Sequence, residues 1–179
     1  ASLQEALGID PGNAKVLAAL ARVCEHRGDH AGLANVLSEQ ALTANDGAER
    51  LSLLLRLGNL QEHQVKDAAA ARATYQSALQ INPEAAEAIS GLERAFDDEN
   101  LPNEEVLPIS KHLARFYENT EKYDRWAEVL QRLAGVSKDK SEKLRNLQLL
   151  VDIYEGPASD KVSAFGAALQ IFEIEASDD

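Results

Sequence analysis

Apolar residues recur at intervals of three and four along the whole chain, with polar residues between them. This spacing places the apolar residues on one side of a helix, and no stretch alternates in the way that a half-buried strand does. The pattern therefore predicts an all-α protein. We expect helices at residues 12–27, 30–44, 47–63, 67–81, 84–97, 103–118, 123–136, 140–155 and 159–175, after a short helical segment at 2–8.

The breaks between these segments carry helix-start signals. Asp10-Pro11 and Asn82-Pro83 each place an N-cap side chain before a proline at the first helical position. Asp46 is followed three residues later by Glu49, a variant of the capping box. Because the connections are short, we expect successive helices to lie antiparallel.

The chain also repeats itself. Residues 6–11 return at 78–83, a shift of 72, and a longer match at a shift of 93 pairs residues 20–22 with 113–115. Such periods are typical of stacked helical hairpins. We therefore expect one continuous repeat array, with a first half at 1–96, an irregular joint at 97–112 and a second half at 113–179. The absence of methionine and the start inside a repeat suggest a fragment of a longer protein.

One set of residues resembles the tetratricopeptide repeat, whose two helices carry small and aromatic residues at fixed places and whose unit is closed by proline. The residues that fill those places are Leu54, Leu57, Gly58, Ala71, Tyr75, Ala78 and Pro83, with one extra residue at the turn 65–67. The chain looks like a degenerate array of the bacterial type. The resemblance implies a right-handed superhelical solenoid of antiparallel helix hairpins, with a peptide-binding concave face.

Charge and composition narrow the classes of partner. The formal net charge of −12 disfavours binding to the phosphate backbones of nucleic acids and to anionic membranes. We therefore expect no nucleic-acid binding. No apolar run approaches the roughly 20 residues that span a bilayer, so we expect no membrane insertion. The single cysteine fits a reducing compartment and slightly favours the cytoplasm, although a fragment can lack its targeting signal.

The sequence carries no motif for catalysis, for a cofactor or for a metal. His26 and His30 are four residues apart, but the Gly28-Asp29 pair predicts a helix end between them and no third ligand is near. Cys24 lies on the predicted packing face, where a lone cysteine acts as a small apolar residue. We therefore expect a protein that is not an enzyme and has no cofactor.

The resemblance places the first helix of each hairpin on the concave face. The side chains expected there as partner-binding candidates are Lys15, Arg22, His26, Asn59, His63, Arg94, Lys111 and Arg115. Because arginine binds carboxylates through two parallel donors, one hypothesis is a basic track for an acidic or C-terminal segment. The alternative is that these arginines pair with Glu25, Glu62 and Glu118, one turn away on the same surface.

These observations favour a protein–protein interaction scaffold that holds a peptide or a partner helix in its groove. A second interpretation is a regulatory or spacer region of a multidomain enzyme or a transport assembly. A third is self-association through exposed apolar ends. The residues that predict such ends are Leu3 and Leu7 near the start, and Phe165, Leu169, Ile171, Phe172 and Ile174 in the last helix.

Overall fold

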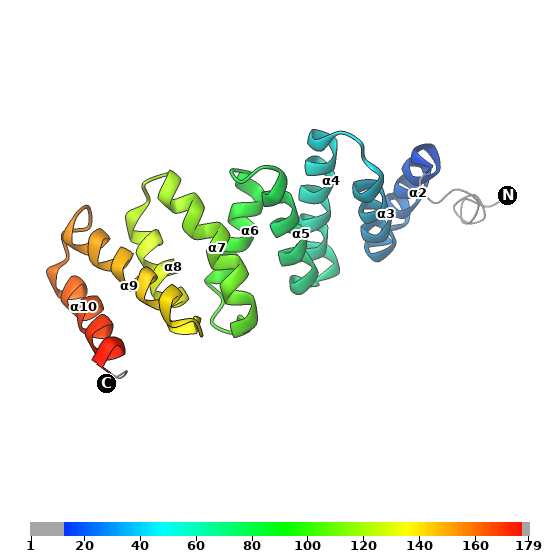
Figure 1. Cartoon of the computed structure of the whole chain (residues 1–179). Coiled ribbons are helices and arrows are strands. Elements are labelled where there is room, and N and C mark those ends of the chain that lie inside the picture. The colour runs from blue at the N-terminus through cyan, green and yellow to red at the C-terminus, as the bar shows by residue number, and fades with distance from the viewer. Residues whose placement is uncertain (1–12, 177–179) are drawn as a thin grey trace. The chain divides into compact units, whose positions relative to one another are not determined.

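A computed structural model describes residues 13–176. Within that range the chain forms nine α-helices and one π-helical turn, and no strand (Figure 1). The expected all-α class is confirmed. The helix at 2–8, the Asp10-Pro11 cap, Leu3 and Leu7 lie outside the described residues.

Contacts divide the chain into two compact units, Ala1–Ala95 and Phe96–Asp179. The first unit contains α2 (Ala14–Arg27), α3 (His30–Thr43), α4 (Gly47–Leu60), the π turn η1 (Gln61–Val65), α5 (Ala68–Ile81) and α6 (Ala86–Phe96), whose last residue crosses the boundary. The second contains α7 (Asn103–Asn119), α8 (Tyr123–Val136), α9 (Lys140–Glu155) and α10 (Lys161–Ala176). Apart from the end of α4, every boundary lies within about two residues of the expected one.

Short polar side chains cap the N-termini of several of these helices. The carboxylate of Asp46 accepts a hydrogen bond from the Glu49 amide at 3.1 Å, as its sequence predicts. Four more Asn or Asp side chains cap helices in the same way, at Asn13, Asp29, Asp67 and Asp139. Each satisfies amide donors that the first helical turn leaves unpaired.

The expected cap at Asn82 is wrong in its position. The Asn82 side chain accepts from the Glu84 amide at 3.0 Å, and the Ala85 amide donates to the Asn82 carbonyl at 3.1 Å. These two bonds form a separate turn, and α6 begins at Ala86 after it. Pro83 therefore lies in the turn and not at the first position of the helix.

The core of the first unit lies between successive helices, because α3 packs on both α2 and α4, and α4 packs on α5. Its centre is aliphatic: Leu17 is 1% exposed and Leu37 is fully buried. Cys24 packs against this cluster and is partly buried, as the sequence predicts. Burial raises the pKa of the Cys24 thiol. This environment favours a structural role for Cys24.

A single aromatic ring joins three helices of the first unit. Tyr75 on α5 is 2% exposed, and its ring lies between Gly58 of α4 and Gly91 of α6. A methyl group on Gly58 would come within 2.6 Å of Tyr75 Cε1, and one on Gly91 would come even closer to the other edge of the ring. Both positions therefore require glycine if the ring is to stay between the helices.

The second unit is built from α7 to α10, each packed on the next. Tyr117 and Leu113 of α7 are fully buried in it. The expected joint covered residues 97–112. In the structure residues 97–102 form the connection before α7, residues 103–112 belong to α7, and Pro108 lies inside that helix. The connection is held by an ion pair between Asp97 and Arg125, whose atoms Oδ1 and Nη2 are 2.8 Å apart.

The glycine contacts predict a double-mutant cycle. Gly91→Ala should destabilise the first unit by about 1–2 kcal/mol, because the clash with the ring outweighs the roughly 1 kcal/mol that alanine gains in a helix. Tyr75→Ala alone should cost about 3 kcal/mol. In the Tyr75→Ala background, Gly91→Ala should become neutral or stabilising. Urea unfolding followed by circular dichroism measures all four variants.

Gly47→Ala is the matched control, since a methyl group there meets nothing within 4 Å and Gly47 lies in the same unit. It should leave stability unchanged or raise it slightly. Equal effects of Gly91→Ala with and without the Tyr75 ring would show that the ring does not require the glycine.

Candidate functional site

The π turn at the end of α4 places two polar side chains against α5. A π turn contains one residue more than an α turn, so it accommodates the extra residue that the sequence places near 65–67. It ends at Lys66, whose φ of 64° is left-handed. The Thr74 hydroxyl donates to Gln61 Oε1 at 2.7 Å, and the Tyr75 hydroxyl donates to Glu62 Oε2 at 2.8 Å.

The Glu62 carboxylate also receives both donors of an arginine. Arg94 Nε lies 2.7 Å from Glu62 Oε1, and Arg94 Nη2 lies 2.7 Å from Oε2. This bidentate geometry is the strongest form of an arginine–carboxylate pair. It connects α6 to the end of α4, although the two residues are 32 positions apart in the sequence.

The pKa values of the three groups follow from these contacts. The Arg94 hydrogen bonds, helped by that of Tyr75, hold the pKa of Glu62 below its ordinary value despite partial burial. Burial, followed by the bond to Glu62, raises the pKa of the Tyr75 hydroxyl. The bond to Glu62 raises the pKa of Arg94. Glu62 and Arg94 are therefore charged, and Tyr75 is neutral, at physiological pH.

A hollow of about 340 Å³ opens beside this cluster in the first unit. It brings together three of the residues predicted from the sequence: Asn59, His63 and Arg94. Tyr75 forms part of its wall, and α6 contributes Ala86, Glu87 and Ser90. The lining offers both hydrogen-bond donors and hydrogen-bond acceptors, and it contains side chains of positive and of negative charge. Such a lining suits the recognition of a polar segment.

The predicted residues of α2 lie away from this hollow. Lys15, Arg22 and His26 are all exposed. Arg22 has no ion pair with any residue between 13 and 176, and the neighbouring Glu25 pairs with Arg56 of α4. Of the three carboxylates weighed as partners from the sequence, Glu62 does pair with an arginine, but that arginine is Arg94 of another helix and not a residue one turn away.

In the second unit, Lys111 Nζ lies 3.2 Å from Glu142 Oε1, so its charge is compensated by α9. Arg115 is exposed on the same helix as Lys111. Burial, followed by the nearby charge of Arg115, lowers the pKa of His112. Lys111 and Arg115 therefore belong to a different unit from the other predicted residues Asn59, His63 and Arg94.

Ion pairs connect alternate helices in both units. Glu25 of α2 pairs with Arg56 of α4, and Lys111 of α7 pairs with Glu142 of α9, in the same way that Glu62 pairs with Arg94. The paired residues are about 31 positions apart in each case. Alternate helices within a unit therefore present their polar sides close together.

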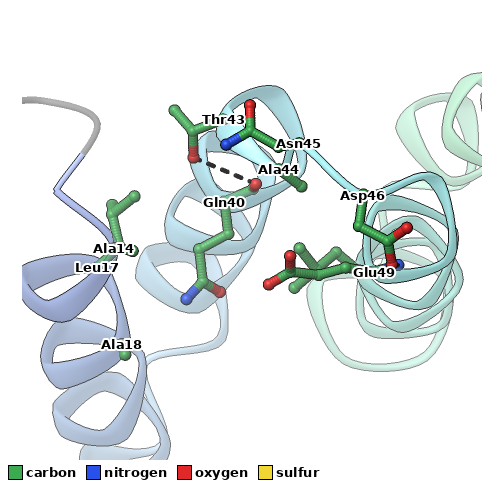
Figure 2. A pocket seen from close by; sticks show the side chains of 10 residues that line it. Ala14, Leu17, Ala18, Gln40, Thr43, Ala44, Asn45, Asp46 and Glu49 are labelled. Atoms are coloured by element: carbon green, nitrogen blue, oxygen red, sulfur yellow. Dashed lines mark hydrogen bonds between the residues drawn. The ribbon is translucent and has the colours of Figure 1, made fainter.

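A second hollow of about 420 Å³ was not predicted from the sequence. It lies between α2, the end of α3 and the start of α4, where the side chains of Gln40 and Glu49 extend toward it (Figure 2). Leu17 and Leu53 contribute apolar walls. The Thr43 hydroxyl donates to backbone carbonyls at the end of α3 and helps to shape its edge. None of the predicted partner-binding residues lines it.

Within residues 13–176, no three His, Cys, Asp or Glu side chains form a group that could hold a metal ion. His26 and His30 are both exposed. None of the helices in that range is long and apolar enough to cross a membrane.

No protein-family model matches the chain, and no curated protein matches it. Among solved structures, the crystal structure of BtubC (BKLC) from P. vanneervenii is similar to it, with 15% sequence identity and a TM-score of 0.35. That match covers 98% of this chain and 86% of BtubC. A TM-score this low does not establish a shared fold or function.

The Glu62 cluster predicts a pH dependence. A carboxylate whose pKa is lower in the folded than in the unfolded state stabilises the fold above the unfolded pKa of about 4.3, and this contribution is lost as the pH falls through the folded pKa. Glu62→Gln should therefore reduce stability by about 1 kcal/mol at pH 7 and much less at pH 3. Urea unfolding at both pH values measures the difference.

Glu39→Gln removes one exposed carboxylate from α3 and controls for the change in net charge. If Glu62→Gln had the same small effect as Glu39→Gln at both pH values, the cluster would not contribute to stability.

Proposed function

We propose that this chain is a protein–protein interaction scaffold, and that the first unit binds a peptide or a partner helix across α2, α4 and α6. One observation carries the proposal: Asn59, His63 and Arg94, which the sequence placed on a binding face, line one hollow in that unit. The chemistry is recognition by several side chains, with no reactive centre and no enzymatic activity.

The rigidity of this surface supports a binding role. Arg94 is fixed by two hydrogen bonds to Glu62, and Glu62 is fixed in turn by the buried ring of Tyr75. Side chains that are already ordered lose less conformational entropy when a partner binds. The polar wall of the hollow is therefore preorganised for a ligand.

The distribution of charge refines the expected partner. Glu62 offsets the charge of Arg94, whereas Arg22 on α2 has no such partner among the described residues. We therefore assign the recognition of an acidic side chain or a C-terminal carboxylate to Arg22, and hydrogen bonding of the adjoining segment to Asn59 and His63. Arg115 offers a second exposed guanidinium, in the other unit.

The finer architecture belongs to the same proposal. The short connections between helices that pack on each other, the small-residue contacts of Tyr75 and the pairing of alternate helices all support tetratricopeptide-like hairpins of a right-handed superhelix. In such an array the groove is formed by the first helix of each hairpin, which in the first unit means α2, α4 and α6.

Fluorescence anisotropy with a labelled peptide tests the acidic-partner proposal. A peptide of alternating Glu and Ala should bind more tightly than the same peptide with Gln in place of Glu, and added salt should weaken it. Arg22→Glu should lower the affinity for the Glu peptide about tenfold, which corresponds to 1.4 kcal/mol.

Arg50→Glu makes the same charge change at an exposed residue nine positions before Asn59, on the opposite side of α4. It should leave the affinity nearly unchanged. Equal binding of the Glu and Gln peptides, or equal losses in the two arginine variants, would contradict the proposal.

A further inference from the structure

The last helix carries an apolar surface on the side away from its own unit. Val162, Phe165, Leu169 and Phe172 are 83%, 71%, 45% and 66% exposed. On the opposite side, Ala164 and Ala167 are buried where α10 packs on α9. A helix that is apolar on both sides is normally covered on both sides.

Comparison with α5 shows that this exposed apolar surface is particular to α10. The 93-residue shift aligns Phe172 of α10 with Leu79 of α5, and Ala168 with Tyr75. Leu79 and Tyr75 are each 2% exposed, and the Tyr75 ring contacts Gly91 of α6. Leu79 is therefore covered in α5, whereas its counterpart Phe172 is 66% exposed. The counterparts of Val162, Phe165 and Leu169 are Ala69, Arg72 and Gln76, so the large apolar side chains at these three positions are particular to α10.

The spacing of the exposed residues indicates which helix fits. They follow one another at intervals of three, four and three, which is the spacing of a two-helix seam. In an antiparallel pair of α10 helices, Phe165 of each copy packs beside Leu169 of the other, and Val162 packs beside Phe172. Every large apolar residue of the surface then has an apolar neighbour.

The charges beside the seam agree with this arrangement. Lys161 and Glu175 flank the same edge of the seam, at opposite ends of α10, and both are exposed. Antiparallel pairing brings Lys161 of each copy near Glu175 of the other, which gives two ion pairs between the copies. A parallel pair in register would instead place Lys161 near Gly166 and form no such pair.

We propose that α10 is a self-association surface, which pairs antiparallel with α10 of a second copy of this chain. This goes beyond the proposed partner binding, since it uses a different unit and a different kind of contact. The seam is only about two heptads long, shorter than a free coiled coil needs, but each α10 is already held in place by α9. The dimer is therefore expected to be reversible and dependent on concentration.

Sedimentation velocity of the 179-residue chain over a concentration series tests the dimer. The wild-type chain should shift from monomer to dimer as its concentration rises. Phe172→Glu should raise the dissociation constant at least about thirtyfold, because an aromatic side chain of the seam is replaced by a charge. Phe165→Glu should act in the same direction.

Leu42→Glu is the matched control, because Leu42 on α3 is also 66% exposed but lies outside α10. It should leave the dissociation constant unchanged. Circular dichroism should show the wild-type helix content in all three variants, since none of the replaced side chains is buried.

The two charged residues test the orientation. Lys161→Glu and Glu175→Lys should each weaken the dimer roughly fivefold. The double variant should regain the wild-type dissociation constant, and a mixture of the two single variants should form a heterodimer tighter than either homodimer.

A chain that stays monomeric at every concentration would overturn the proposal and would leave a different molecule as the partner of this surface. A dimer that Phe172→Glu and Phe165→Glu do not weaken would overturn it as well. A dimer that responds to the phenylalanines but not to the charge exchange would overturn the antiparallel pairing.

Discussion

The first unit depends on the space that two glycines leave for the ring of Tyr75. Because neither Gly58 nor Gly91 has a side chain, α4 and α6 can both approach the ring of α5. The position of the ring then sets the position of its hydroxyl, which lies 2.8 Å from the Glu62 carboxylate. A packing constraint in the core thus determines where a charged group lies at the surface.

The polar surface of the unit follows from that carboxylate. Glu62 orients Arg94, and the two together form one side of the hollow that also contains Asn59 and His63. Exposed ion pairs contribute little to stability individually, so the pairs between alternate helices matter chiefly for the arrangement of side chains. The buried ring supplies the stability, and the charged groups provide the specificity of the proposed binding surface.

The sequence predicted the helices well because helix ends and apolar spacing are local properties. Asp46 and Glu49 lie three residues apart, and a cap of this kind is visible without knowledge of the fold. The π turn was missed because its polar side chains bond to α5, which is a tertiary contact. The true start of α6 was missed because a separate local turn at Asn82 precedes the helix. Arg94 was found as a surface candidate, but its pairing with Glu62, 32 residues away, is a tertiary contact that spacing alone does not reveal.

Amide hydrogen exchange in the Gly91→Val variant is the most direct test of the central role of the ring. Valine at this position forces the Tyr75 ring and α6 apart, so the amides of α6 should lose protection while those of the α2–α3 pair keep it. The account predicts that loss in α6 and, with it, faster exchange at the π turn that holds Glu62. Unchanged protection of α6 would contradict the claim that the ring between the two glycines holds the unit together.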